Sequence, residues 1–202
     1  MCGNSYSIYQ MIIHCSTVRF ISEVLENEEY SFLYKDLVVM DLGCNIGTFS
    51  LWIMKNAKVI HAVDISVENI EHLNNTLRDN LIPNIKTYCV GISGKTETRK
   101  ALRRGKPEDG GWGIDEAGDF LIDTYSLNDF MSRNGIPYID VLKMDVEGAE
   151  AEIVEAPDFP SDRVSTIIGE YHGDRMERTK RALDLKGYRW TDFGGGHFTA
   201  RR

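Results

Sequence analysis

The spacing of hydrophobic residues changes repeatedly along the chain between two patterns. Residues 37–42 form a nearly continuous apolar run, which is typical of a buried strand, whereas the apolar positions of residues 46–56 favour a helix. The same succession of strand and helix returns along most of the chain. Strands are predicted at 37–42, 58–64, 85–90, 120–125, 138–145, 164–171, 188–193 and 197–202, and helices at 46–56, after Ser66, and at 126–133, 148–155 and 174–186.

This alternation predicts an α/β fold, in which a mostly parallel sheet has helices on both faces. The strands at 188–193 and 197–202 flank a run of glycines, 194–196, and are predicted to form a β-hairpin that makes the last strand antiparallel. In sheets of this kind a ligand lies outside the carboxyl ends of the strands, where the strand order reverses. The residues that directly follow strands are therefore the candidates for function.

The first 36 residues are less informative than the rest of the chain. Ser16 or Thr17 can cap a short helix. Residues 1–36 are therefore predicted to be an N-terminal helical extension, and residues 37–202 are predicted to be the main domain.

The segment from Ser93 to Ala117 breaks the alternation, because it is polar, charged and rich in glycine. We expect a long excursion with a short edge strand at 98–103, and excursions of this length are often functional. Trp112 lies among glycines and is a candidate for a mobile aromatic lid. Basic residues in this segment either form solvated surface or attract an acidic or phosphorylated substrate, or RNA. They are Lys95, Arg99, Lys100, Arg103, Arg104 and Lys106.

Composition places limits on the class of protein. The 202 residues are enough for one domain with a sizeable core, and 42% of them are hydrophobic and 27% charged, as in an ordinary globular protein. Lys and Arg number 23 against 31 Asp and Glu, which gives a formal charge of −8 and disfavours a nucleic-acid partner. The sequence does not indicate an oligomeric state.

Cysteine usage and the lack of long apolar segments favour a cytoplasmic protein. The four cysteines are scattered without CxxC spacing, so they indicate neither a zinc site nor a disulfide framework. No apolar run approaches the ~20 residues of a membrane span, and the N-terminal sequence is not typical of a signal peptide.

The loop after the strand at 37–42 has the sequence DLGCNIG. Gly43 permits a sharp turn, and Gly47 permits the first turn of the helix to approach the strand or a ligand closely. The helix N-terminus presents unpaired N–H groups, which suit a carboxylate or a phosphate. Asp64 ends the next strand about 20 residues further along, where an acid is expected to hydrogen-bond a ribose. Together these features predict a nucleoside-binding site.

S-adenosylmethionine fits this site better than a dinucleotide. A dinucleotide site has the pattern GxGxxG, but Asn45 occupies the position of the middle glycine. Asp41 adds a carboxylate, which is unfavourable beside a pyrophosphate and favourable beside an ammonium or sulfonium group. The alternative is a strand–turn–helix unit with a purely architectural role. The expected cofactor-binding residues are Asp41, Gly43, Asn45, Gly47, Asp64 and Ile65.

Three stretches of the chain resemble the FkbM family of S-adenosylmethionine-dependent methyltransferases. They are DLGCNIGTFSL, HAVDISVENIEHLNNTL, and YSLNDFM together with IDVLKMDVEGAE, and the resemblance covers about residues 37–172. It implies a Rossmann-like class I methyltransferase fold, with a mostly parallel seven-stranded sheet and an antiparallel last strand. It also implies O-methylation of a hydroxyl group on a small molecule, sugar or lipid.

The resemblance also implies the roles of individual residues. Gly43, Asn45 and Gly47 would lie at the methionine end of the cofactor, and Asp64 would lie at its ribose. The family often has Glu where this chain has Asp64, so the shorter acid would have to lie closer to the ribose. It often has Ala where this chain has Cys44, which is a mild departure.

Methyl transfer needs alignment of the acceptor and removal of its proton, because the cofactor itself supplies an electrophilic methyl group. Asp145 ends the strand at 138–145 and is the preferred candidate for the base. Lys143 lies on the same face of that strand, so it either pairs with Asp145, which we favour, or acts as the base. Glu147 is a further candidate, although an acid at a helix start also stabilises the helix dipole.

Glu170 and His172 end the following strand and point to one face. They are a second candidate for the catalytic base. With Asp145 they could also supply three ligands for a divalent metal, although the interpretation without a metal is preferred.

Two alternatives to O-methylation remain. The first is RNA or protein N-methylation, which is disfavoured because the Asn-Pro-Pro-Tyr motif of many N-methylating enzymes is absent. The second is a non-catalytic nucleoside-binding protein, since fold alone does not establish activity. Carboxylates and a histidine at the strand ends argue against this second alternative.

Overall fold

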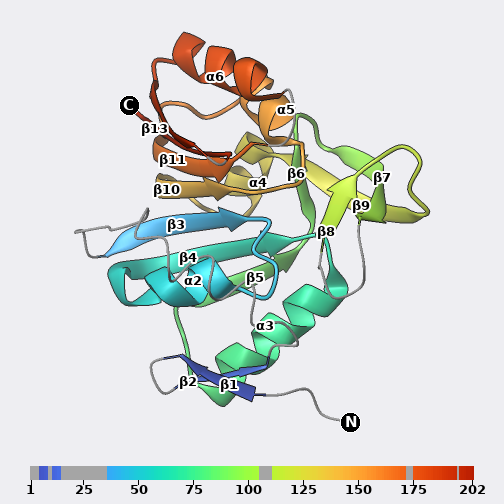
Figure 1. Ribbon diagram of the computed structural model, residues 1–202, viewed down its shortest axis with the longest axis vertical. Helices are drawn as coiled ribbons and strands as arrows, with labels where there is room; N and C mark the ends of the chain where they lie inside the picture. The colour runs from blue at the N-terminus through green and yellow to red at the C-terminus, as the bar shows by residue number, and fades with distance from the viewer. Residues whose placement is uncertain (1–4, 9–10, 15–35, 105–110, 172–174, 195) are drawn as a thin grey trace.

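The computed structural model describes residues 5–8, 11–14, 36–104, 111–171, 175–194 and 196–202 (Figure 1). The strands are β1 (Ser5–Ile8), β2 (Met11–His14), β3 (Leu37–Leu42), β4 (Ala57–Asp64), β5 (Ile85–Cys89), β6 (Gly91–Ser93), β7 (Glu97–Arg104), β8 (Gly111–Ile114), β9 (Phe120–Ser126), β10 (Ile139–Met144), β11 (Val164–Glu170), β12 (Arg189–Gly194) and β13 (His197–Arg201). The helices are α2 (Thr48–Ile53), the 3-10 helix η2 (Met54–Asn56), α3 (Val67–Asp79), α4 (Leu127–Arg133), α5 (Glu150–Glu155) and α6 (Met176–Leu185).

A seven-stranded sheet with the order β12-β13-β11-β10-β3-β4-β5 forms the centre of the protein (Figure 1). Neighbouring strands from β11 to β5 are parallel, whereas β13 is antiparallel to both β11 and β12. The predicted fold class is therefore confirmed. The strand order reverses between β3 and β10, so the carboxyl ends of these two strands are where a ligand is expected.

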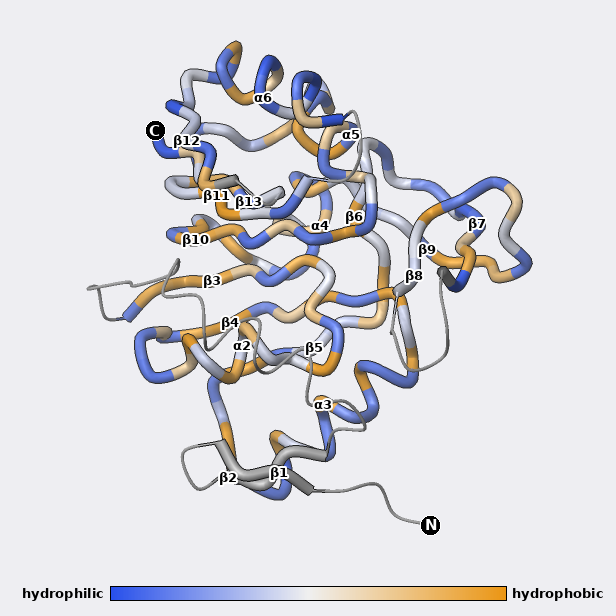
Figure 2. The backbone as a smooth tube through the Cα atoms, viewed as in Figure 1, coloured by the Kyte–Doolittle hydropathy of each residue, from blue (hydrophilic) through white to orange (hydrophobic). Residues whose placement is uncertain are grey.

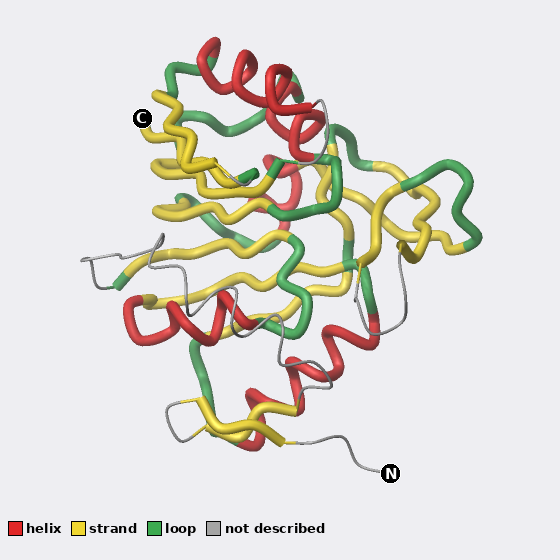
Figure 3. Tube along the Cα trace, in the orientation of Figure 1, coloured by secondary structure: helices red, strands yellow, loops and turns green. Residues whose placement is uncertain are grey.

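Helices cover both faces of this sheet, as Figure 3 shows, and each face buries its own hydrophobic cluster. Val39 packs with the α2 and α3 side, which includes Leu73. The neighbouring residue Met40 packs with the opposite side, which includes Ile153 of α5. Successive side chains of β3 point to opposite faces, so its nearly continuous apolar run fills two cores.

The helices follow the amphipathic pattern in the sequence. Figure 2 shows hydrophobic and hydrophilic residues alternating along α3 and α6. Ser66 caps α3 as predicted, because its hydroxyl accepts a hydrogen bond from the Asn69 N–H at 3.2 Å. The helix predicted at 148–155 begins later, at Glu150.

The described part of residues 1–36 contains a two-stranded antiparallel sheet of β1 and β2, which the sequence did not indicate. The helix predicted after Ser16 or Thr17 lies outside the described residues. Among the described residues, no helix combines the length and the apolar character needed to span a membrane.

Residues 91–126 contain a second, four-stranded sheet with the order β6-β9-β7-β8. The strand predicted at 120–125 is confirmed as β9, but the segment 93–117 was expected to be a mostly irregular excursion. The strand predicted at 98–103 is confirmed as β7, but it lies between β9 and β8 and not at an edge. Trp112 is in β8, the edge strand of this sheet, and is paired with Arg103 of β7. Charged residues suggested a loop, but the segment Glu97–Arg104 pairs with β8 and β9 and forms a strand.

The second sheet lies beside the expected ligand site. Its first strand, β6, starts at Gly91, almost directly after β5 ends at Cys89. In Figure 1 the second sheet occupies the side toward which β3 and β4 point. It therefore extends the protein at the carboxyl ends of the central strands.

Candidate active site

Gly43 brings the loop after β3 into direct contact with the end of β10. Its φ of +72° is left-handed, and a Cβ at this position would lie 1.7 Å from the carbonyl oxygen of Asp145. The N–H groups of Gly43 and Cys44 both donate to the Val63 carbonyl of β4, at 2.9 and 3.0 Å. The glycine loop is thus fixed between β4 and β10, and only glycine fits at its first turn.

Two further residues of the loop have left-handed backbones, Asn45 with φ of 50° and Gly47 with φ of 87°. The Asn45 side chain accepts a hydrogen bond from the Ile46 N–H at 2.7 Å, which stabilises its turn. A Cβ at Gly47 would lie 2.4 Å from Cδ1 of Leu73. The close approach predicted for Gly47 is therefore made to α3.

Asp64 connects the glycine loop to the start of α3. Its Oδ2 accepts from the Asn45 N–H at 2.8 Å, and its Oδ1 accepts from the Ser66 N–H at 2.8 Å and from Asn69 Nδ2 at 3.3 Å. The residue is 8% exposed, and burial raises the pKa of its carboxyl while these hydrogen bonds oppose the rise. Because a carboxylate oxygen accepts two hydrogen bonds, Oδ2 can accept one more.

Ile65 lies between β4 and α3 at the ends of two neighbouring strands. Its side chain is half-buried, and its carbonyl accepts from Sγ of Cys89, at the end of β5, at 3.8 Å. This position is consistent with the prediction that Ile65 contacts the nucleoside.

Lys143 is central to the polar contacts at the carboxyl ends of β3 and β10, where the strand order reverses. Its Nζ donates to the Gly43 carbonyl at 3.0 Å and lies 3.4 Å from Oδ2 of Asp145. The same Nζ lies 3.4 Å from Oδ1 of Asp41. The predicted pairing of Lys143 with Asp145 is therefore present, and the ammonium also joins both residues to the glycine loop.

Asp41 is a buried anion and not an open binding position. It has no exposed surface, and its Oδ2 accepts a hydrogen bond from the Ser50 hydroxyl at 2.6 Å. Its other oxygen faces Lys143. A direct contact with the amino group of a cofactor would thus require the Lys143 side chain to move.

The turn between β10 and α5 carries the acidic candidates. The side chain of Asp145 is 33% exposed, and Glu147 has a left-handed backbone with φ of 53°. Glu147 precedes α5, so the interpretation that it stabilises the first turn of that helix does not apply. Glu150, in contrast, is fully buried, and its Oε1 accepts from the N–H groups of Val146 and Gly148, both at 3.1 Å.

Glu170 lies at the end of β11, next to the strand that carries Asp145. The preceding residue, Gly169, is paired with Met144, and Glu170 itself is paired with His197 of β13. His172 lies outside the described residues. Within the described ranges, no group of three or more His, Cys, Asp and Glu side chains is arranged to hold a metal ion.

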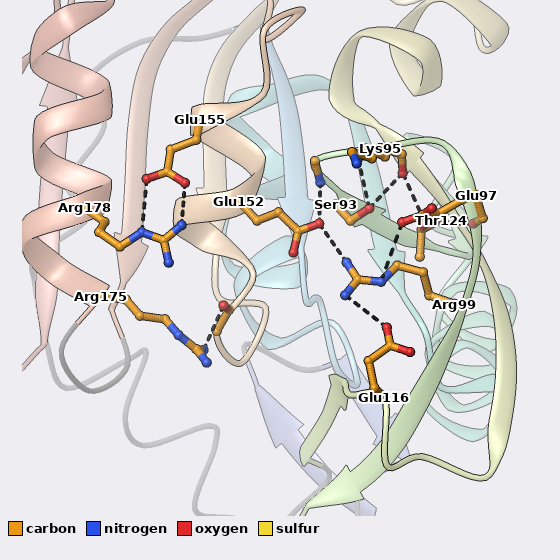
Figure 4. Close-up of polar contacts among 12 residues, drawn as sticks. Ser93, Lys95, Glu97, Arg99, Glu116, Thr124, Glu152, Glu155, Arg175 and Arg178 are labelled. Atoms are coloured by element: carbon orange, nitrogen blue, oxygen red, sulfur yellow. Dashed lines mark hydrogen bonds and ion pairs between the residues drawn. The ribbon is translucent and has the colours of Figure 1, made fainter.

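In the second sheet, Arg99 faces α5 and is surrounded by acidic side chains (Figure 4). Arg99 lies 2.7 Å from Glu152 of α5, 3.6 Å from Glu116 and 3.9 Å from Glu97. Oε1 of Glu152 also accepts a hydrogen bond from the Gly94 N–H at 3.0 Å. Because Gly94 directly follows β6, this bond connects the second sheet to α5. The positive charge of Arg99 is therefore balanced by these carboxylates, and Arg99 does not contribute to a cationic surface.

Sequence reasoning did not identify Ser50, Glu152 or Arg175. Ser50 is a buried polar residue in an otherwise apolar helical turn, and this isolated polarity is a usable signal. Glu152 and Arg175 meet their partners through the tertiary fold. Arg175 donates to the Gly148 carbonyl at 2.8 Å (Figure 4), a contact between residues far apart in the sequence that no local pattern marks.

Comparison with known sequences identifies related proteins. The family model described as "Methyltransferase FkbM domain" matches residues 41–191. A protein of Clostridium tetani (strain Massachusetts / E88), named an uncharacterized RNA methyltransferase, is 39% identical over 74 residues. That match covers 36% of this chain and only 16% of the relative.

Solved structures with a similar fold include several methyltransferases. Precorrin-6y C5,15-methyltransferase from Geobacter metallireducens GS-15 has a TM-score of 0.54 and 13% identity, and the match covers 84% of this chain and 82% of that chain. Trm5b from Pyrococcus abyssi has a TM-score of 0.56 and 13% identity, and the match covers 99% of this chain and 54% of that chain. At such low identity the likeness shows the fold alone.

Proposed function

The chain belongs to the FkbM methyltransferase family, and on that premise we propose that it transfers a methyl group from S-adenosylmethionine to a hydroxyl group of a small molecule, sugar or lipid. One observation carries the proposal. Lys143 contacts the Gly43 carbonyl, Asp41 and Asp145, so the glycine loop and the acid at the end of β10 form a single site.

The glycine loop and Asp64 are the proposed cofactor site. Gly43, Asn45 and Gly47 would surround the methionine end. The remaining acceptor capacity of Asp64 Oδ2 suits a ribose hydroxyl, and Ile65 lies next to it. The cofactor, when bound, supplies the electrophilic methyl group.

Asp145 is the proposed base. Its side chain is 33% exposed, and its Oδ2 lies 3.4 Å from Nζ of Lys143. A carboxylate in this position can accept the proton of an acceptor hydroxyl. Lys143 thus has a supporting role. Glu170, at the end of β11, and His172, two positions later in the sequence, are the alternative proposed bases.

The proposal is tested by incubating the protein with methyl-labelled S-adenosylmethionine and fractionated metabolites. We expect label in the methyl ether of a hydroxyl-bearing acceptor, and Asp145→Asn should lower the rate by ~10²–10⁴-fold, as the loss of a general base does. Asp129→Asn, an acid in the first turn of α4, is the control. Binding of NAD but not of S-adenosylmethionine would refute the cofactor assignment.

RNA methylation is the second candidate, because the relative from Clostridium tetani is named as an RNA methyltransferase. The net charge of −8 and the neutralisation of Arg99 support a small acceptor instead. Ribonuclease treatment of the labelled product separates the two candidates, since only labelled RNA would be degraded to small fragments.

A further inference from the structure

The acidic residues of α5 contact three different parts of the protein. Glu155 pairs with Arg178 of α6, and Glu152 pairs with Arg99 of the second sheet (Figure 4). Glu150 instead points back to the turn that precedes its own helix. It is fully buried, whereas Glu155 lies at the surface.

The carboxylate of Glu150 closes this turn from the inside. Its Oε1 accepts from the N–H of Val146 and from that of Gly148 at 3.1 Å each. Between these two residues the backbone is left-handed at Glu147, and it stays left-handed at Gly148 with φ of 107°. A non-glycine residue adopts this conformation only at an energetic cost, so the turn depends on the contacts that hold it.

Arg175 closes the same turn from the outside. Its Nη1 donates to the Gly148 carbonyl at 2.8 Å and lies only 1.6 Å from where a Cβ of residue 148 would be. At the other end of the turn, the Asp145 N–H donates to the Leu42 carbonyl at 3.1 Å. The turn is therefore held at its start by the Asp145 backbone, and at its end by Glu150 and Arg175. The direction of the Asp145 side chain depends on these contacts.

We infer that Glu150 is a positioning residue for methyl transfer, which holds the turn so that Asp145 faces the acceptor. This inference rests on the proposed function. Glu150 does not touch the reacting atoms, because it is buried beneath the turn. Its contribution comes from one oxygen that accepts two backbone hydrogen bonds.

The test compares substitutions that separate hydrogen-bond acceptance from charge. Glu150→Ala removes the acceptor, and we expect kcat to fall by ~10²-fold, as a small displacement of a catalytic group does, while the Kd of S-adenosylmethionine is unchanged. Glu150→Gln keeps an oxygen at the same reach and should restore kcat. Glu150→Asp keeps the charge but is one methylene shorter, so it should remain impaired. Glu155→Gln, on the surface of the same helix, is the matched control.

The outcomes distinguish this inference from the proposed function. If the wild-type protein transfers no methyl group, the proposed function fails. If the wild-type protein is active and Glu150→Ala keeps its kcat, only the positioning role is overturned. Equal loss of activity in Glu150→Gln and Glu150→Ala would assign the effect to the carboxylate charge and would also overturn it. If Glu150→Ala does not fold, the contrast between the Gln and Asp variants decides.

Discussion

Asp64 is a single side chain that holds two parts of the candidate site together. It accepts hydrogen bonds from the backbone of Asn45 in the glycine loop and from Ser66 and Asn69 at the start of α3. Hydrogen bonds to a charged acceptor in a buried position are among the stronger ones in proteins. The acid therefore shapes the loop before any cofactor binds to it.

We expect Asp64→Ala to weaken the binding of S-adenosylmethionine by at least ~10-fold, because a lost hydrogen bond to a charged group costs about 1.5–3 kcal/mol. Isothermal titration calorimetry measures the change. Asp79→Asn, at the other end of α3, is the control and should bind as the wild type does. Unchanged affinity in Asp64→Ala would remove this residue from the cofactor site.

His61 makes stability depend on pH. It is 4% exposed on β4, and its Nδ1 lies 2.9 Å from the Tyr88 hydroxyl. Burial, with a smaller contribution from Lys86, lowers its pKa from 6.5 to about 4. Between these values the unfolded chain binds a proton that the folded protein does not, so stability falls as the pH decreases through this window.

We expect His61→Phe to reduce this dependence, because the variant keeps a ring beside Tyr88 but cannot be protonated. Melting temperatures measured between pH 6.5 and about 4 should fall less steeply for the variant than for the wild type. His72→Gln, on the exposed face of α3, should keep the wild-type slope. Parallel wild-type and His61→Phe curves would exclude His61 as the source.

The glycine loop and the β10–α5 turn are two elements in direct contact. Gly43→Ala would place a Cβ 1.7 Å from the Asp145 carbonyl, whereas Gly135, also left-handed with φ of 63°, has no atom within 4 Å of its Cβ position. Gly135→Ala should cost only the conformational term of about 1–2 kcal/mol. Gly43→Ala should cost more in urea unfolding and should also weaken S-adenosylmethionine binding. Equal effects of the two substitutions would show that the contact with Asp145 is unimportant.

The contact between the second sheet and α5 is another link between elements. The Arg99 side chain is 19% exposed and lies near Glu97, Glu116 and Glu152, whereas the side chain of Arg178, which pairs with Glu155, is 61% exposed. We expect Arg99→Met to lower the free energy of unfolding by about 1–2 kcal/mol and Arg178→Met by less than about 1 kcal/mol. Urea unfolding at one salt concentration measures both. A larger effect of Arg178→Met would contradict this ranking.

The central sheet could be predicted because its residues carry strong local signals. The apolar run at 37–42 and the cap at Ser66 are recognisable without knowledge of their neighbours. The predicted pairing of Lys143 with Asp145 followed from the two-residue period of a strand. Contacts that depend on one strand or one helix turn were therefore accessible from the sequence.

Other features depend on contacts between distant residues and could not be predicted. The strand β7 has charged residues on both faces, so its pattern was typical of a loop, and only its pairing with β8 and β9 defines it. The close packing of Gly47 on Leu73 of α3 also joins two separate elements, and the local sequence did not indicate it. Glu150 was recognised only as part of a motif, because burial by tertiary packing is not visible in the local sequence.

Considered as one body, the protein has a net charge of −8, and the basic stretch of the second sheet is opposed by acids at Arg99. Such a protein gains little from counterion release by a polyanion. We expect the KM of the acceptor to change little with salt concentration. A polyanionic acceptor would instead lose ~10³-fold or more in affinity between low and moderate salt, and such a loss in steady-state assays would favour RNA as the substrate.

The second sheet joins the central domain at two neighbouring points. Gly91 and Ser93, where it begins, are paired with Thr124 and Ser126, where it ends. An insertion whose ends are adjacent can be exchanged in evolution or by engineering without moving the strands that flank it. Chimeras that replace residues 94–123 with the equivalent segment of a relative should therefore keep the central sheet intact and retain the original cofactor.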